Sequence, residues 1–157
     1  MHIEVDAIRE SMLNGFAFPD PLDPDGEWAE QFRLARRTVQ FMARDYADHD
    51  VDCFIDDACI PANFRDQYGT MFDDPRTTLV FAYPGPAAQI ERMRKRNGRF
   101  DEELIDVISQ PFFPTLMESV DTTGWVELRD PAATLDDNVA IVLAALTRAA
   151  APQPPAG

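Results

Sequence analysis

Short apolar runs alternate with helical segments along this chain, and that alternation restricts the possible folds more than any other feature. Cys53-Phe54-Ile55 and Leu79-Val80-Phe81 are continuous apolar runs, each too short for a buried helix. Runs of this kind are typical of strands buried on both faces of a parallel sheet. Parallel strands need long crossover connections, and helical segments lie between the runs. The pattern predicts an α/β fold of three layers (αβα) around a mostly parallel sheet.

Four strands are expected, at His2–Asp6, Val51–Asp57, Thr77–Tyr83 and Trp125–Leu128. The length of 157 residues suits a single domain, expected over 1–150, followed by a Pro-rich frayed tail at 151–157. Three prolines within Phe16–Gly26 predict a loop there.

The clearest helix is expected over Glu27–His49. Its apolar residues recur at the spacing of one buried face, and they are Trp28, Phe32, Ala35, Val39, Met42 and Tyr46. The arginines of this segment, Arg36 among them, lie mostly off that stripe. Further helices are expected at Ala7–Asn14, Asn63–Met71, Ala87–Asn97 (closed by Gly98), Asp101–Ser109 and, after interruption by Pro111 and Pro114, Leu116–Val120.

The last helix is expected to begin after Thr134, which has the spacing of a capping box with Asp137. Its apolar residues are expected to face the core, and they are Val139, Val142, Leu143 and Leu146.

The formal net charge of −14 argues against nucleic acid and anionic membranes as partners. No apolar run approaches the roughly 18 residues of a membrane-spanning helix, and no secretory signal is recognisable. We therefore expect a cytoplasmic protein whose two cysteines, Cys53 and Cys59, are reduced and serve as small buried apolar residues.

Basic residues are concentrated in one short segment. Five of the fourteen lie within eight positions, and they are Arg92, Arg94, Lys95, Arg96 and Arg99. Arg92, Arg96 and Arg99 have the spacing of one helix face. Such a row of guanidinium groups suits a polyphosphate, because each group can form paired hydrogen bonds with phosphate oxygens. A solvated helix face balanced by Glu91, Asp101 and Glu102 remains an equal alternative.

Carboxylates are predicted at the ends of two strands. Asp6 ends the first expected strand, and Asp56 and Asp57 end the second. The carboxyl ends of parallel strands border the ligand crevice of α/β folds. Acidic side chains there can hold a metal ion or accept a proton from a hydroxyl group. The alternative is that Asp56 or Asp57 caps the following turn.

In order and spacing, these segments resemble the small-molecule P-loop kinases, the broad set that includes chloramphenicol phosphotransferase-like and zeta-toxin-like proteins. His2-Ile3-Glu4-Val5-Asp6-Ala7-Ile8-Arg9 resembles their second strand, and Cys53-Phe54-Ile55-Asp56-Asp57 resembles their third. Thr78-Leu79-Val80-Phe81-Ala82-Tyr83-Pro84 resembles the fourth, and Glu91-Arg92-Met93-Arg94-Lys95-Arg96-Asn97-Gly98 resembles the lid helix. Trp125-Val126-Glu127-Leu128 resembles the fifth strand, so the likeness spans nearly the whole chain.

The resemblance implies an ATP-dependent phosphotransferase that acts, with Mg²⁺, on a hydroxyl group of a small molecule. It implies that Asp6 is the general base or substrate anchor and that Arg9 helps to hold the substrate. It implies that Asp56 or Asp57 organises Mg²⁺. The lid arginines would bind the nucleotide and neutralise charge on the transferred phosphoryl group, and they are Arg92, Arg94 and Arg96.

One part of the family pattern is missing, since the chain has no Gly-Lys pair and hence no G-x-x-x-x-G-K-[S/T] loop. In these kinases that loop follows a first strand at the centre of the sheet, which would precede Met1 here. Without it, the strands at Val51–Asp57 and Thr77–Tyr83 are expected to pair directly or to leave a gap. Three functions stay open: a kinase given without its loop, a degenerate relative that binds an anion, and an acidic interaction domain.

Overall fold

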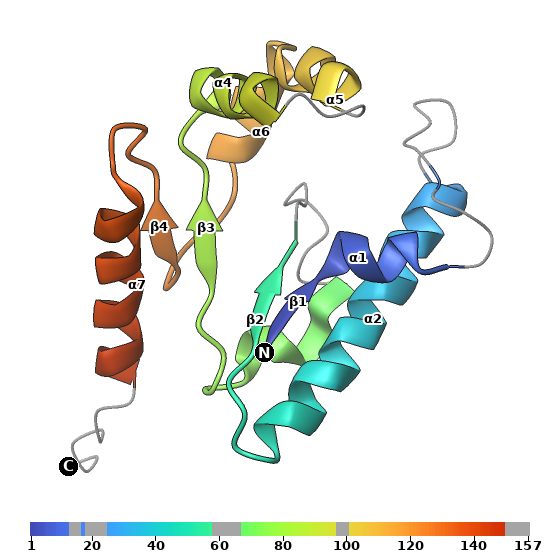
Figure 1. Ribbon diagram of the computed structural model, residues 1–157, viewed down its shortest axis with the longest axis vertical. Helices are drawn as coiled ribbons and strands as arrows, with labels where there is room; N and C mark the ends of the chain where they lie inside the picture. Colours follow the sequence, from blue (N-terminus) through green and yellow to red (C-terminus); the bar gives the residue numbers. More distant parts are fainter. Residues whose placement is uncertain (13–16, 18–24, 58–66, 97–100, 150–157) are drawn as a thin grey trace. The chain divides into compact units, whose positions relative to one another are not determined.

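The structure of the chain is a computed structural model that describes residues 1–12, 17, 25–57, 67–96 and 101–149. Within these ranges, the side chains of six residues are not described, and they are Arg96, Asp101, Glu103, Leu104, Val107 and Ala149. The chain divides into two compact units, the N-terminal unit Met1–Asp74 and the C-terminal unit Pro75–Gly157 (Figure 1).

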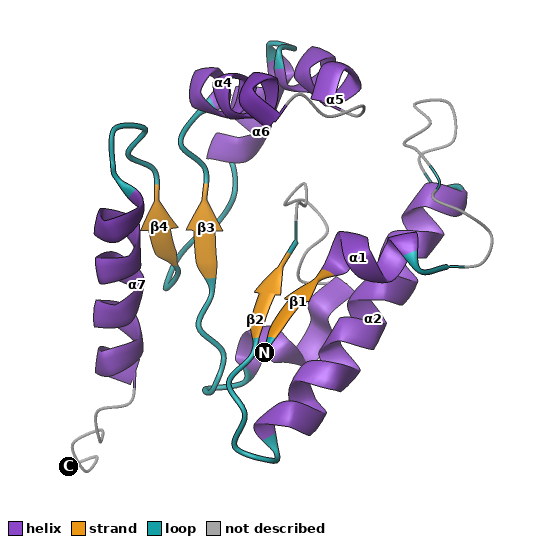
Figure 2. Cartoon of the chain, viewed as in Figure 1, coloured by secondary structure: helices purple, strands orange, loops and turns teal. Residues whose placement is uncertain are grey.

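The N-terminal unit is a parallel strand pair covered by helices. Strand β1 (His2–Glu4) pairs with β2 (Phe54–Asp56), so that Ile3 lies opposite Ile55. Between them in the chain come α1 (Val5–Glu10) and α2 (Glu27–Ala47), which pack against each other. The 3₁₀ helix η2 (Gly69–Asp73) follows β2 (Figure 2).

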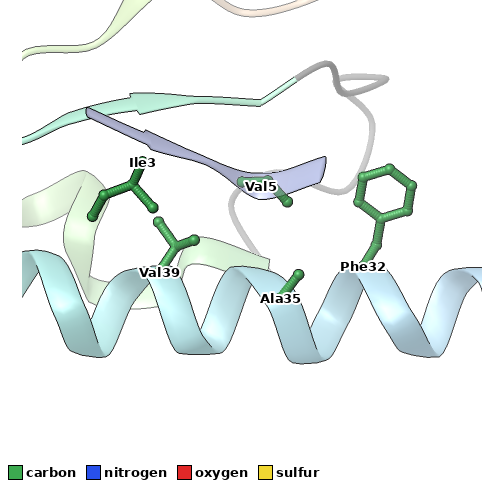
Figure 3. Packing of buried hydrophobic residues seen from close by; sticks show 5 residues of the cluster. All are labelled: Ile3, Val5, Phe32, Ala35 and Val39. Carbon is green, nitrogen blue, oxygen red and sulfur yellow. The ribbon is translucent and has the colours of Figure 1, made fainter. Parts of the chain in front are cut away.

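The core of this unit forms between β1, the start of α1 and one face of α2. Figure 3 shows its buried apolar side chains, which are Ile3, Val5, Phe32, Ala35 and Val39. Burying each of the larger ones contributes about 1.5–3 kcal/mol. Trp28 and Met42 pack on the edge of this cluster, so the predicted stripe of α2 is largely confirmed. The prediction that Arg36 lies off the buried face is wrong, because Arg36 is buried.

The C-terminal unit repeats the arrangement with different helices. Strand β3 (Val80–Ala82) pairs in parallel with β4 (Val126–Leu128). The crossover consists of α4 (Pro86–Arg96), α5 (Asp101–Ile108) and α6 (Phe112–Glu118), and α7 (Leu135–Ala149) follows β4 and contacts it. The described side chains of its core are Phe81, Tyr83, Ile108, Phe113 and Met117.

Several element boundaries differ from those expected. Strand β1 ends at Glu4, because helix α1 already begins at Val5, and Asp6 therefore lies in the first helical turn. Helix α6 begins at Phe112 rather than Leu116, so Pro114 lies in its first turn. A residue in the first turn has no helical partner for its backbone N–H, so Pro114 removes no helical hydrogen bond there.

Helix α7 has the predicted capping box. The Thr134 N–H donates to Asp137 Oδ2 over 2.9 Å, and the Asp137 N–H donates to Thr134 Oγ1 over 3.2 Å. The prediction that its apolar side chains all face the core is wrong. Val139, Leu143 and Leu146 are exposed, and Val142 is half-buried.

The α/β class and the parallel strands are confirmed. Within the described ranges, each of the four strands has a single neighbour, and the sheets contain β1 with β2 and β3 with β4. No helix in these ranges is both long enough and apolar enough to cross a membrane.

Several expectations lie outside the described residues. They concern most of the loop Phe16–Gly26, the first half of the helix Asn63–Met71, Cys59, the helix-closing Gly98, Arg99 and the tail 151–157.

Candidate functional site

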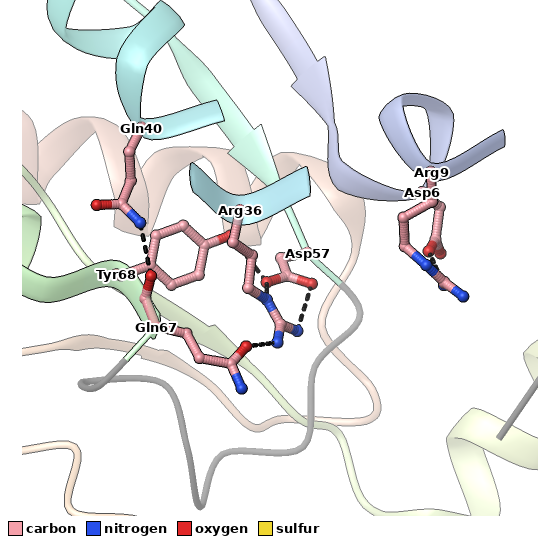
Figure 4. A network of polar contacts seen from close by, with 7 residues as sticks. All are labelled: Asp6, Arg9, Arg36, Gln40, Asp57, Gln67 and Tyr68. Carbon is pink, nitrogen blue, oxygen red and sulfur yellow. Dashed lines mark hydrogen bonds and ion pairs between the residues drawn. The ribbon is translucent and has the colours of Figure 1, made fainter. Parts of the chain in front are cut away.

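A buried ion pair joins helix α2 to the end of strand β2. Arg36 Nε donates to Asp57 Oδ2 over 2.6 Å, and Arg36 Nη2 donates to Asp57 Oδ1 over 3.1 Å (Figure 4). The two side chains are only 8% and 6% exposed. Paired hydrogen bonds between a guanidinium and a carboxylate fix the orientation of both groups. Asp57 is therefore held in one orientation by a residue 21 positions earlier in the chain.

Neighbouring polar groups complete this pair. The Tyr68 hydroxyl donates to Asp57 Oδ2 over 2.8 Å, and Arg36 Nη1 donates to the side-chain carbonyl of Gln67. Gln40 Nε2 donates to the backbone carbonyl of Gln67 over 2.6 Å. Each of the three guanidinium nitrogens of Arg36 is thus hydrogen-bonded, which offsets the cost of burying its charge.

A second buried arginine, Arg9, contacts the ring of Phe32, which Arg36 also contacts. Arg9, on α1, is 2% exposed, and its Nη1 donates to Asp6 Oδ1 over 2.9 Å. Its Nη2 donates to the carbonyl of Ala17 over 2.9 Å. The Cζ atoms of Arg9 and Arg36 lie 3.7 Å and 4.6 Å from the centroid of the Phe32 ring, so this ring contacts two guanidinium groups. Burial lowers the pKa of Arg9, and the hydrogen bond with Asp6 opposes that effect.

These contacts separate the predicted carboxylates into two kinds. Asp57 is enclosed by Arg36 and Tyr68, whereas Asp56, at the end of β2, is exposed. Asp6 pairs with Arg9, and its side chain is still 48% exposed. In the part of the chain that the structure describes, no group of three or more His, Cys, Asp or Glu side chains is placed to hold a metal ion.

The predicted lid arginines belong to the other unit, on α4. Lys95 pairs with Glu91 over 2.7 Å, and the hydrogen bond from Lys95 lowers the pKa of Glu91. Arg92 and Arg94 are exposed, and neither has an ion pair or hydrogen bond among the described residues. The side chain of Arg96 lies outside the described part. Glu91 thus pairs directly with Lys95, and the nearby charge of Arg92 also lowers the pKa of Glu91.

Sequence reasoning missed Arg36, Phe32 and Tyr68 as members of a polar cluster. One signal was available for the first two, because residues four apart lie on the same helix face and Arg36 follows Phe32 at that spacing. Nothing in the local sequence pointed to Tyr68, which reaches Asp57 only through the fold.

Three comparisons bear on the identity of this site. No protein-family model matches the sequence, and no curated protein or solved structure is significantly similar to it. What the site does must therefore be argued from its own residues.

Proposed function

We propose that this chain belongs to an ATP-dependent phosphotransferase that acts on a hydroxyl group of a small molecule. The pairing of the strands carries this proposal. Both pairs are parallel, and helices connect the two strands of each pair. The small-molecule P-loop kinases that the sequence resembles are likewise built from parallel strands with helical crossovers.

Helix α4 supports the same proposal. The chain as a whole has a net charge of −14, so an anionic ligand needs a local excess of positive charge. The exposed guanidinium groups of Arg92 and Arg94 provide one, because neither group forms an ion pair or a hydrogen bond among the described residues. Phosphoryl transfer depends mainly on positioning and on neutralising the phosphate oxygens. We assign the nucleotide phosphates to Arg92 and Arg94, and to Arg96 by its place in the same helix.

The contacts in the N-terminal unit divide the roles of the acidic residues. Asp6 would accept the proton of the substrate hydroxyl or anchor that hydroxyl, with Arg9 fixing the orientation of its carboxylate. Asp56, exposed at the end of β2, would organise Mg²⁺. Asp57 already accepts hydrogen bonds from Arg36 and Tyr68, so its role in this proposal is to hold the end of β2 in place.

Calorimetric titration of Mg²⁺ and ATP into the purified chain tests the role of α4. We expect saturable binding that weakens about tenfold or more in the double variant Arg92→Ala/Arg94→Ala, a loss of about 1.4 kcal/mol. The matched control is Arg33→Ala/Arg37→Ala, which removes the same charge from exposed positions of α2. Equal weakening in both variants, or no binding by the wild-type chain, would contradict the assignment.

A transfer assay separates catalysis from binding alone. The chain is incubated with ATP labelled at the γ-phosphate and a panel of hydroxylated small molecules. Transfer to a hydroxyl, lost in Asp6→Asn, is the expected result. Nucleotide binding without transfer would favour the alternative of a degenerate relative that binds an anion.

A further inference from the structure

Tyr83, directly after strand β3, carries a buried hydroxyl group that makes no hydrogen bond. The residue is 5% exposed, and its ring contacts those of Phe81 and Phe113 at centroid distances of 6.1 and 6.3 Å. Its backbone N–H donates to the carbonyl of Leu128 over 3.2 Å, which fixes it at the end of the strand pair. Among the described residues, no donor or acceptor reaches its hydroxyl oxygen.

A second unpaired polar atom belongs to Gln89, which follows Tyr83 in the chain after the turn between β3 and α4. Gln89 is in α4, where its backbone N–H donates to the carbonyl of Gly85 over 3.1 Å. Its side-chain oxygen Oε1 is buried and has no hydrogen-bond partner in the described part. Gly85, between the two residues, has a φ of +92°, and no atom lies within 4 Å of the position a Cβ would occupy there. The residues that precede and follow the β3–α4 turn thus each carry one buried, unpaired polar atom among the described residues.

Tyr68, the other buried tyrosine among the described residues, differs from Tyr83 in that its hydroxyl is hydrogen-bonded. Tyr68 is 6% exposed, and its hydroxyl donates to Asp57. Buried polar groups are nearly always paired, and an unpaired one destabilises the fold. Tyr83 and Gln89 lie at the carboxyl end of a parallel strand, which is the edge where α/β sheets bind ligands. Their position therefore points to hydrogen bonds with a bound molecule.

The chemistry of the two groups restricts that molecule. Gln89 Oε1 only accepts a hydrogen bond, whereas a tyrosine hydroxyl both donates and accepts. The nearby cation, Arg129, forms an ion pair with Glu127 over 2.7 Å and lies over the Phe81 ring, so its charge is already balanced. Burial, and then the charge of Glu118, raise the pKa of Tyr83, which therefore stays protonated at neutral pH. An anionic ligand group is disfavoured here, and a neutral one is favoured.

We propose that Tyr83 and Gln89 bind a neutral hydroxyl group of a small polyol-like substrate. The ligand hydroxyl donates to Gln89 Oε1 and accepts a hydrogen bond from Tyr83. This inference rests on the proposed function, because it names the substrate class of that phosphotransferase. Such a site rejects analogues that lack the hydroxyl, because they leave both protein groups unpaired.

The experiment compares ligand-free stability with polyol binding in the same variants. Tyr83→Phe removes the unpaired hydroxyl, so we expect an unchanged or raised Tm, whereas Tyr68→Phe lowers Tm by a few degrees. Glucose, ribose and myo-inositol are then titrated calorimetrically without nucleotide. We expect at least one to bind the wild-type chain and to bind Tyr83→Phe and Gln89→Met about tenfold more weakly.

Three outcomes would overturn the inference. The first is a drop in Tm for Tyr83→Phe as large as that for Tyr68→Phe, which means that the hydroxyl is already satisfied inside the folded chain. The second is unchanged polyol affinity in both variants, and the third is no binding of any of the three polyols. These titrations contain no nucleotide. A negative result would therefore contradict the polyol site without contradicting ATP binding at α4, which is tested separately.

Discussion

The N-terminal and C-terminal units differ in how their buried polar groups are hydrogen-bonded. Each is a parallel strand pair with helices, and each places a tyrosine with a buried ring near the ends of its strands. In the N-terminal unit, Tyr68 and Arg36 complete the hydrogen bonding of Asp57. In the C-terminal unit, the hydroxyl of Tyr83 has no partner in the described part. The hydrogen bonds of Asp57 are made within the described chain, whereas the hydroxyl of Tyr83 keeps its hydrogen-bonding capacity.

Each unit also carries its own spectroscopic reporter. The chain has two tryptophans, of which Trp28 lies in the N-terminal unit and Trp125 in the C-terminal unit. Both contact a phenylalanine of their own core edge-on, since Trp28 lies 5.0 Å from Phe32 and Trp125 lies 6.3 Å from Phe81. The backgrounds Trp125→Phe and Trp28→Phe therefore report on one unit at a time.

The largest loss of stability is expected in the N-terminal unit, from the variant Arg36→Met. The variant leaves the carboxylate of Asp57 buried without its cation, which costs about 3–5 kcal/mol. Urea unfolding followed by Trp28 fluorescence, in the Trp125→Phe background, measures the loss. The control is Arg37→Met, at the exposed neighbouring position, where a change within about 0.5 kcal/mol is expected. Equal effects of the two variants would mean that the ion pair does not stabilise the unit.

Phe32 in the N-terminal unit and Phe81 in the C-terminal unit are expected to differ in their contribution to stability. Phe32 and Phe81 are almost equally buried. Phe32 contacts two buried guanidinium groups, whereas Phe81 contacts, among the described residues, only that of the half-exposed Arg129. We expect Phe32→Leu to cost about 1–2 kcal/mol more than Phe81→Leu, because cation–π contacts are stronger when desolvated. Denaturation midpoints in the two single-tryptophan backgrounds give the difference. A larger loss for Phe81→Leu would contradict the role assigned to the shared ring.

The capping box of α7 is expected to have a smaller effect, confined to the C-terminal unit. Thr134→Ala removes the acceptor of the Asp137 N–H and costs about 1 kcal/mol. Thr147→Ala is the matched control, because Thr147 lies inside the same helix, where alanine is the better helix former. Urea unfolding followed by Trp125 fluorescence, in the Trp28→Phe background, measures the stability of both variants. A loss in Thr147→Ala as large as that in Thr134→Ala would exclude the cap as the cause.

The smallest effect on stability is expected from the titration of Tyr83 at alkaline pH. Burial raises the pKa of Tyr83 above its ordinary value of 10.0, so the folded state holds the phenolic proton more tightly than the unfolded state. This contribution to stability is fully present below pH 10.0 and is lost as the pH rises through the folded-state pKa. Unfolding free energies of the C-terminal unit should therefore fall more steeply above pH 10.0 in the wild type than in Tyr83→Phe. Identical slopes would show that Tyr83 titrates normally.

Sequence patterns predicted which helices and strands exist more accurately than the residues at which they begin and end. The strand expected at His2–Asp6 exists, but the stretch from Val5 is helical, so Asp6 lies in a helical turn and pairs with Arg9. The helix expected at Leu116–Val120 begins earlier, at Phe112, because a proline is compatible with a first turn. Boundaries such as these depend on which backbone groups find partners, and residue preference alone does not decide that.

Of the candidate site, the sequence identified the acidic residues and the basic helix but not their partners. Arg92 and Arg94 lie on α4 as expected, and Lys95 is paired with Glu91 one turn away. That Asp57 is enclosed while Asp56 is exposed was not predictable, since adjacent residues of a strand point to opposite faces and only the fold decides which face is covered.

The features that sequence patterns predicted correctly are local: the buried stripe of α2, the capping box of α7 and the helical segments between the strands. These follow from the spacing of residues that are close together in the chain. The tertiary structure, in contrast, determines which charges are buried and which polar groups stay unpaired. Arg36 is buried because Asp57 and Gln67, 21 and 31 positions away, complete its hydrogen bonds. A charge enters a protein interior only where such partners meet it, and their meeting depends on the whole fold.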